Sequence, residues 1–301
     1  MDSFVNLHVH SLHSIQDSVI KIEELIDKVI EYDQSSVAIT DHSSCAAWIK
    51  FSQCAKEKNI HPIFGNEFYC WQFGESKNSD RDHLVLLAMN QEGMVNIRRF
   101  QRLAVNNFYY KPILRYEVLQ ENPHDGIYAT SACFSSTISK YILLNSFDRA
   151  ANYCEFFYNL FDGNFALELQ FHPDFHMQSI VNMGLVKLSE ELSIPLTVSS
   201  DAHFLDEKDR DLRRIVKAIS YNKEYNEIDE SLKSNCFGNS ELIMKFAKES
   251  DFPYMDLVPK AIKQTQKIAK QCKGYIEEPK RHIPIFDKHD ELDKLFELQE
   301  W

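Results

Sequence analysis

The chain has 301 residues, 44% of them hydrophobic, and a formal net charge of −12, so it can bury one large core plus a small extension. It contains no apolar run of about 18 residues and no charged-then-apolar leader, and we therefore expect a cytoplasmic protein without a membrane span or a secretory signal. The acidic balance argues against a nucleic-acid partner, because phosphate contacts need Lys and Arg, unless bound divalent cations supply positive charge locally.

Seven apolar runs predict β-strands, and most of them end in a residue that can bind a metal ion. The runs are Phe4–His10, Ser36–His42, His61–Glu67, His83–Ala88, Gly126–Cys133, Asn164–Gln170 and Leu196–His203. Amphipathic stretches between most of the runs predict helices at Ile20–Tyr32, Ala46–Lys58, Met94–Val105, Phe147–Phe161 and Gln178–Leu192. Alternating strands and helices predict a parallel sheet, and seven such units favour a barrel related to the (β/α)8 type over an open sheet.

The pattern changes after Asp206, where helices are predicted at Leu212–Tyr221, Asn239–Lys248 and Val258–Cys272. We therefore divide the chain into a barrel, residues 1–220, and a helical extension with a tail, residues 221–301. The prolines of Glu277–Pro284 and the charged run Asp287–Lys294 indicate a linker or a tail packed at the edge of the barrel.

The seven cysteines form an odd set without a CxxC pair. This pattern argues against both a disulfide scaffold and a zinc finger. We expect six of them to be small buried hydrophobic residues. Cys133 is the exception, because it closes a predicted strand.

Basic residues cluster on two predicted helices, Arg98, Arg99 and Arg102 on one and Arg210, Arg213, Arg214 and Lys217 on the other. For both clusters a solvated helix face is the preferred interpretation, and substrate contact is the alternative.

Barrels of this type carry their chemistry at the carboxyl ends of the strands. Residues at i and i+2 of a strand face the same side, so His8 and His10 form one pair and Asp201 and His203 another. The candidate ligands are His8, His10, Asp17, His42, Glu67, His83, Cys133, Asp201 and His203. Burying so many ionisable groups without ions would be costly, so metal is expected. Nine ligands imply two or three divalent ions that share a carboxylate, and imidazole, carboxylate and thiolate together suit zinc, manganese or iron.

The motifs at these positions carry a family resemblance. The order HVHS, AITDH, GNEFY, HLVLLAMNQEG, SACF and SSDAHF resembles the PHP (polymerase and histidinol phosphatase) domain, as found at the amino terminus of bacterial DNA polymerase III alpha subunits. The polymerase version is indicated by HLVLLAMNQEGMVNI, by FYYKP at Phe108–Pro112 and by LELQ at Leu167–Gln170. In the tail, Lys267–Cys272 and His282–Phe286 resemble the segment that leads into the polymerase palm.

The resemblance implies a distorted (β/α)7 PHP barrel and a three-ion site. In that arrangement His8, His10, Glu67 and Asp201 hold one ion, Glu67 bridges to a second held with His83 and Cys133, and Asp17, His42 and His203 hold a third. Catalysis would depend on Glu67, Asp201 and His203. His13 departs from the family pattern, and we expect it to lie behind the ligands rather than bind metal.

The activity implied is hydrolysis of a phosphate ester by hydroxide that the cations generate, with a DNA 3′ end as substrate, in a 3′–5′ exonuclease or phosphodiesterase. One alternative is a PHP subunit of a split replicase, which docks on a separate polymerase or replication subunit in DNA replication. A second alternative is a small-molecule phosphatase of the histidinol phosphatase type, which the motifs outside the site disfavour. The resemblance places the palm beyond Trp301, so DNA polymerisation is not expected of these residues.

Overall fold

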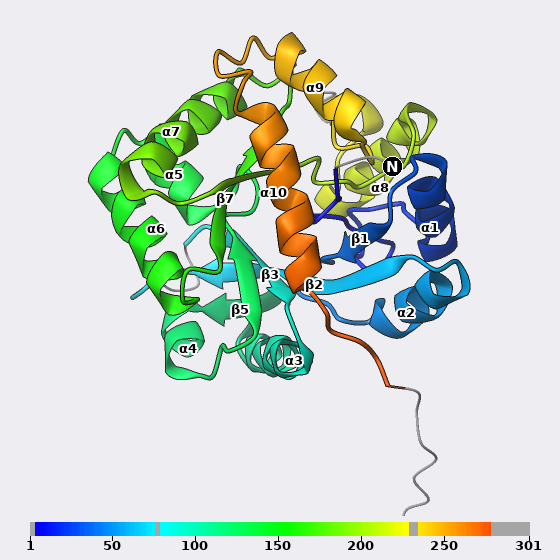
Figure 1. The fold of residues 1–301 in the computed structure, drawn as a ribbon, viewed down its shortest axis with the longest axis horizontal. Helices are drawn as coiled ribbons and strands as arrows, with labels where there is room; N and C mark the ends of the chain where they lie inside the picture. Colours follow the sequence, from blue (N-terminus) through cyan, green and yellow to red (C-terminus); the bar gives the residue numbers. More distant parts are fainter. Residues whose placement is uncertain (1–3, 76–78, 229–233, 278–301) are drawn as a thin grey trace, which may run out of the picture.

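The computed structural model describes residues 4–75, 79–228 and 234–277. The tail features expected at 279–284, 282–286 and 287–294 lie outside the described residues. Figure 1 shows a curled sheet with helices packed around its outside. The predicted α/β barrel with a carboxyl-terminal helical extension is therefore confirmed, whereas the boundary at residue 220 stays a prediction.

The sheet contains six of the seven predicted runs, and its order is β4-β5-β2-β3-β6-β7-β8, with β1 paired to β2. The strand predicted at Phe4–His10 is wrong, because this segment forms only isolated bridges. The strands are β1 (Ser36–Ile39), β2 (His61–Trp71), β3 (Asp82–Ala88), β4 (Phe108–Tyr109), β5 (Lys111–Arg115), β6 (Ile127–Thr130), β7 (Phe165–Gln170) and β8 (Leu196–Ser199). Segment 4–10 joins the two ends of the curled sheet through isolated bridges to Val37 and Ala202. Its backbone bonds include the Ala38 N–H donating to the Asn6 carbonyl and the His10 N–H donating to the Ala202 carbonyl, at 2.8 and 2.9 Å.

The prediction of a wholly parallel sheet is wrong at β3, which runs antiparallel to both β2 and β6. The connection from β2 to β3, residues 72–81, contains no helix among its described residues. A parallel crossover needs a dozen or more residues, so this short connection can only return the chain antiparallel. The reversal explains why His83 opens its run, whereas the ligands that close a run are His10, His42, Glu67, Cys133 and His203. The amino end of β3 lies at the same edge as the carboxyl ends of its neighbours.

The predicted helices are all present, with ends that shift by a few residues. They are α1 (Ile22–Glu31), α2 (Trp48–Glu57), α3 (Gln91–Asn106), α6 (Phe147–Leu160), α7 (His176–Leu192), α8 (Arg210–Tyr221), α9 (Ser240–Glu249) and α10 (Val258–Gln271). The sequence reading missed β4, β5, α4 (Tyr116–Glu121) and α5 (Thr137–Leu143), which are too short to show a clear period.

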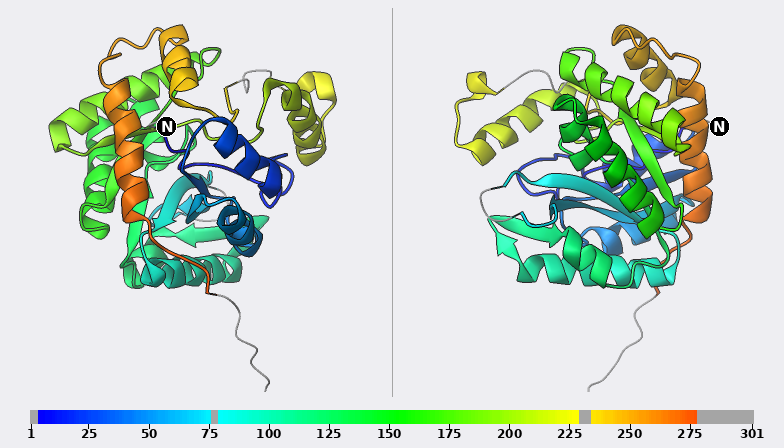
Figure 2. Two further views of the ribbon diagram at one scale, coloured as in Figure 1. Left: turned by 45° about the vertical axis from the view of Figure 1, so that its right-hand side comes forward. Right: turned by 90° about the vertical axis from the view of Figure 1, so that its left-hand side faces the viewer.

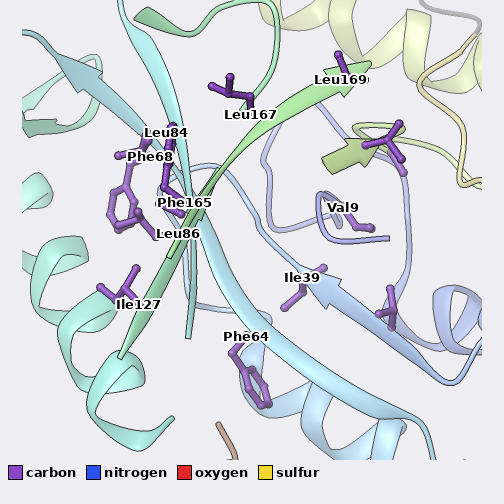
Figure 3. Close-up of a cluster of buried hydrophobic side chains, with 14 of the residues drawn as sticks. Val9, Ile39, Phe64, Phe68, Leu84, Leu86, Ile127, Phe165, Leu167 and Leu169 are labelled. Atoms are coloured by element: carbon purple, nitrogen blue, oxygen red, sulfur yellow. The ribbon is translucent and has the colours of Figure 1, made fainter. Parts of the chain in front are cut away.

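Successive side chains of a strand point to opposite faces of the sheet, so the apolar side chains form two separate cores. Phe68, Leu84, Leu86 and Phe165 point outward from neighbouring strands and lie together under the surrounding helices (Figure 3). A second, smaller core fills the inside of the barrel with Val5, Leu7, Ala38, Ile63, Val85, Leu87, Tyr128 and Ala166. The inner positions nearer the carboxyl ends of the strands are polar, and they form the site described below.

Helix α10 lies across one end of the barrel (Figure 1). Its residues Ile268 and Ala269, with the adjoining Cys272, belong to the inner core. The hydroxyl of Thr265 on this helix accepts a 3.0 Å bond from the Val5 N–H. The extension therefore supports the segment that carries His8 and His10. Within the described ranges, no helix combines the length and the apolar character that a membrane span requires.

All seven cysteines are free thiols. Four of the six that we expected to be buried are so, namely Cys54, Cys70, Cys154 and Cys272. Cys45 and Cys236 are only partly buried, and for these two the expectation is wrong.

Candidate metal centre

Glu67 lies at the centre of a polar cluster at the mouth of the barrel. It is on β2, and only 1% of the residue is exposed. Its Oε1 lies 2.9 Å from Nδ1 of His83 and 3.3 Å from Nε2 of His8. Its Oε2 lies 2.8 Å from Nδ1 of His42 and 3.2 Å from Nε2 of His10. One buried carboxylate therefore contacts imidazoles from three separate segments of the chain.

Asp201 and His203 follow β8 and close the cluster from another side. Asp201 Oδ1 lies 3.3 Å from Nε2 of His8 and 3.2 Å from Nε2 of His10. His203 instead places its Nε2 3.4 Å from Oδ2 of Asp17. The backbone of Asp201 is left-handed, with φ of 48°, a conformation that Asp tolerates better than most residues. The turn at Asp201 allows two residues of one short segment to face different partners.

Asp17 connects the cluster to helix α8. Its Oδ2 lies 3.0 Å from Nε2 of His42. Its Oδ1 lies 3.3 Å from Nη2 of Arg213 and 3.1 Å from Nζ of Lys217. One carboxylate thus contacts candidate ligands on one side and two cations on the other.

His83 and Cys133 complete the network. Cys133 Sγ lies 3.3 Å from Nδ1 of His83, the same nitrogen that contacts Glu67. The preceding residue, Ala132, is left-handed with φ of 57°, which costs a residue other than glycine about 1–2 kcal/mol. Cys133 is thus connected to Glu67 through His83. The contacts described above therefore join all nine candidate ligands in one network.

Five atoms in this network are buried without a hydrogen-bond partner. They are Nε2 of His8, Nε2 of His10, Nδ1 of His42, Oε2 of Glu67 and Oδ1 of Asp201. Several lie 2.8–3.3 Å apart, yet their directions do not meet the geometry of a hydrogen bond. Each unsatisfied buried polar group costs about 1–3 kcal/mol. Cations bound among these atoms would satisfy them all, so the donor set fits divalent metal ions.

The ligand atoms form three overlapping groups whose members lie within 4.8 Å of one another: His8, His10 and Asp201; His42, Glu67 and His83; His10, His42 and His203. The implied three-ion assignment is close to this grouping but places His42 only with Asp17 and His203. In the structure His42 also contacts Glu67, and the rings of His10 and His203 stack 4.2 Å apart. The assignment of each ligand to one ion therefore stays a prediction.

Hydrogen bonds behind the cluster orient the first two histidines. The Nδ1–H of His8 donates to Oε1 of Glu168 at 2.8 Å. The Nδ1–H of His10 donates to the hydroxyl of Ser14 at 3.0 Å, and that hydroxyl in turn donates to Asp41 at 2.7 Å. Both rings therefore present the lone pair of Nε2 to the cluster, as histidines that bind metal do.

Glu168 is a functional residue that the sequence reading missed. It is 2% exposed and also accepts bonds from Thr130, Ser199 and Gln170. A signal was available, because Glu168 and Gln170 alternate with leucines on a wholly buried strand. A polar pair at i and i+2 of a buried strand is the pattern that identified His8 and His10.

His13 contacts residues behind the candidate ligands, and the expectation that it does not bind metal stays a prediction. Its Nδ1–H donates to the hydroxyl of Ser11 at 3.2 Å, and that hydroxyl donates to Oδ2 of Asp41 at 2.8 Å. His13 therefore lies behind the residues that orient His10 and belongs to none of the three groups.

The imidazoles and carboxylates compensate one another when no cation is bound. Burial lowers the pKa of His42, but Glu67 and Asp17 raise it by more, to about 9. Burial raises the pKa of Glu67, but the nearby imidazoles, His83 first, hold it well below its ordinary value. Burial also raises the pKa of the Cys133 thiol well above its ordinary value. Cations would displace these protons, so we expect binding to release them.

A cavity of about 290 Å³ adjoins the cluster, and the residues that line it include Phe134, His172, Phe175, Arg213, Lys217 and Asn235. Burial lowers the pKa of His172 to about 4. The Asn235 side chain donates to the Asp201 carbonyl at 3.1 Å. The sequence reading identified neither residue, since both lie in connections without a period.

The interpretation of α8 as a solvated basic face is wrong for two of its residues. Arg213 is 3% exposed, and its side chain and that of Lys217 reach Asp17 at the cavity. The charged face of α8 turns inward, whereas its apolar residues Leu212 and Ile219 are 52% and 66% exposed. For Arg98 and Arg102 on α3, which are exposed, the solvated interpretation agrees with the structure.

Substitution of Cys133 tests whether its thiol is a ligand. Cys133→His is expected to keep the full metal content, because imidazole is also a suitable donor, whereas Cys133→Ala is expected to lose one ion per chain. Elemental analysis of purified protein measures both. Cys154→Ala is the matched control, since that cysteine is buried outside the site. Full metal content in Cys133→Ala would return Cys133 to the structural cysteines.

A family model described as PHP domain matches residues 6–172 of the chain. The DNA polymerase III subunit alpha of Borreliella burgdorferi is 33% identical over 305 residues, and that of Aquifex aeolicus is 30% identical over 237 residues. These matches cover 99% and 75% of this chain but 26% and 20% of the relatives. The chain thus spans about a quarter of the length of the curated relatives it matches.

Among solved structures, the chain is similar to a two-domain protein from Bacteroides vulgatus described as containing a predicted PHP-like metal-dependent phosphoesterase. The two are 12% identical with a TM-score of 0.41, and the match covers 82% of this chain and 69% of the other.

Proposed function

This chain belongs to the PHP domain family, and from that premise we propose that it is a metal-dependent phosphoesterase that hydrolyses phosphodiesters at DNA ends as a 3′–5′ exonuclease. The family that the motifs indicate is thereby confirmed. One observation carries the proposal. Five buried atoms of the candidate ligands have no hydrogen-bond partner and face one another at the mouth of the barrel. The cavity beside them is also lined by two cationic side chains, Arg213 and Lys217.

The nine candidate ligands would hold two or three divalent ions. Bound there, zinc, manganese or iron would lower the pKa of water to near neutrality and stabilise negative charge on phosphate oxygens. The protein's own residues contribute by holding the donor atoms in position. Glu168 and Ser14 hold the rings of His8 and His10 so that each Nε2 lone pair faces the cluster.

Arg213 and Lys217 are proposed to bind the phosphate. In a chain with a net charge of −12, two cations converge on the cavity from α8. Arg213 is fixed by its bond to the Asn235 side chain at 3.3 Å, in addition to Asp17. Lys217 is the more accessible of the two, with a side chain that is 16% exposed. It is therefore the better candidate for direct contact with a phosphate oxygen.

Lys217→Met is expected to raise KM for a phosphodiester about tenfold, because a charge-assisted bond contributes about 1.5–3 kcal/mol. We expect a smaller change in kcat. The slope of log KM against the logarithm of the salt concentration is expected to fall by about the amount that one phosphate contact contributes. Lys223→Met is the control, because Lys223 follows the same helix but is exposed outside the cavity. Equal KM values for the two variants would exclude Lys217 from substrate binding.

The proposed activity is tested with three substrates: a chromogenic phosphodiester, a phosphomonoester and an oligonucleotide labelled at its 3′ end. An exonuclease releases the labelled nucleotide first and prefers the diester. Preference for the monoester would instead favour the small-molecule phosphatase. No hydrolysis of any of them by metal-loaded protein would refute the phosphoesterase.

A second function, docking in a split replicase, is favoured by the outer face of α8. Leu212, Ile215 and Ile219 lie on one side of this helix and are 47–66% exposed. An exposed apolar stripe of this kind is typical of a protein interface. The curated relatives carry a similar region within a longer polymerase subunit. Co-purification with a polymerase chain, and its loss in Ile215→Lys, would test this role.

A further inference from the structure

The hairpin formed by β4 and β5 presents aromatic rings to solvent. Phe108 is 62% exposed and Tyr110, at the tip, is 74% exposed. Tyr110 has φ of 59°, a left-handed conformation that is uncommon for a bulky residue. Its ring meets that of Tyr109 edge to face at 4.7 Å, and Tyr109 packs near Trp71 at 6.1 Å. The outermost ring is therefore supported from behind by other aromatic residues.

Two cations lie beside these rings. Arg81 Nη2 donates to the Tyr109 carbonyl at 3.4 Å, while its Nε is buried without a hydrogen-bond partner. Lys111 pairs with Tyr109 across the hairpin. In the described part of the chain, Arg81 contacts the Tyr109 carbonyl and Lys111 contacts the Tyr69 ring, and neither forms an ion pair with a carboxylate. Each is free to take an anionic partner.

The hairpin is continuous with the candidate metal centre. Lys111 Nζ lies 5.8 Å from the centre of the Tyr69 ring. Tyr69 stacks on His42 at 4.9 Å and lies 5.1 Å from the ring of His83. The right-hand view of Figure 2 shows the hairpin (teal) and α8 (yellow-green) on the same side of the molecule. A flexible ligand could therefore reach from the hairpin into the mouth of the barrel.

We propose that this hairpin platform, made of Phe108, Tyr110, Arg81 and Lys111, binds the unpaired bases and phosphates of single-stranded nucleic acid that leads into the metal centre. Exposed rings stack on bases and nearby cations contact phosphates, which is the combination that single-strand binding sites use. The proposal rests on the proposed function, for which it names the substrate as single-stranded rather than duplex. In a duplex the bases already stack on one another and leave no face for these rings.

Direct binding tests the platform without catalysis. Fluorescently labelled oligothymidylate is titrated with the full chain in chelator, so that it is not hydrolysed, and anisotropy gives Kd. Phe108→Ala and Tyr110→Asn are each expected to raise Kd about fivefold or more, as loss of one base–aromatic stack does. Asn is chosen at 110 because it tolerates the left-handed backbone without a ring. Tyr110→Phe keeps the ring and is expected to bind like the wild type.

Tyr275→Ala is the matched control. Tyr275 is 55% exposed and bonds to Gln91 at the start of α3. The hairpin follows the other end of that helix, which is about 24 Å long at 1.5 Å per residue. Unchanged Kd in both Phe108→Ala and Tyr110→Asn, or an equal loss in Tyr275→Ala, would overturn the platform.

Hydrolysis separates this proposal from the proposed function. The two hairpin variants are expected to cleave a small chromogenic phosphodiester at the wild-type rate, because that substrate does not reach the hairpin, and to show a raised KM only for the oligonucleotide. Normal binding of the oligonucleotide with no hydrolysis would refute the proposed phosphoesterase activity but would still support the hairpin platform. A variant that lost activity on both substrates alike would count against the platform.

Discussion

Asp201→Asn is expected to lower kcat/KM for a phosphodiester by more than about a hundredfold, since loss of a residue behind a metal ligand already costs about 10–100-fold. Asp201 Oδ1 is one of the buried atoms without a hydrogen-bond partner, and it faces both His8 and His10. The amide keeps the shape of the side chain but loses its charge. Asn also tolerates the left-handed backbone at this position, so the fold should persist.

The assay for Asp201→Asn needs a readout besides activity. Elemental analysis is expected to show the loss of at least one ion per chain, and circular dichroism an intact fold. Asp206→Asn is the matched control, because it also replaces a carboxylate by an amide. Asp206 pairs with Lys28 outside the site. Wild-type rates and full metal content in Asp201→Asn would show that the chemistry lies elsewhere.

Protein purified without chelator is expected to carry two to three ions of zinc, manganese or iron per chain. Removing them should abolish hydrolysis and lower the melting temperature by about 5–10 °C, because a ligand present at about a hundred times its Kd stabilises the folded state by about 2.7 kcal/mol. The structural reason is the set of five buried atoms that have no hydrogen-bond partner. Calorimetry with and without a chelator measures the shift.

A pair of histidine variants provides the control for metal content. His10→Ala should lose at least one ion, since its Nε2 contacts both Glu67 and Asp201. His124→Ala should keep them all, because His124 precedes β6 at the opposite end of the barrel. Fewer than about one ion per chain in the wild type, or an unchanged melting temperature in chelator, would contradict the metal site.

Much of the site could be read from the sequence because buried strands have a strict period of two. His8 and His10 had to share a face, and polar residues after apolar runs had to gather at one edge of a sheet. Most of the nine candidate ligands join one network for this reason, whereas Asp17 lies in a connection and joins it through His42. The same period would have identified Glu168 beside Gln170, which was missed because a single carboxylate within a strand attracts less notice than one at its end.

The direction of each strand and the partner of each helix face were decided only by the tertiary structure. Periodicity indicates which residues are buried and not which way a strand runs, so it does not predict that β3 is antiparallel. The inward turn of Arg213 and Lys217 could not be read from α8, because its apolar side would ordinarily face the core. Here Arg213 and Lys217 pair with Asp17, which lies nearly two hundred positions away in the chain and is brought beside α8 only by the closed barrel. The sequence by itself indicated the candidate ligands and the chemistry of their donor atoms, and the fold decided what surrounds them.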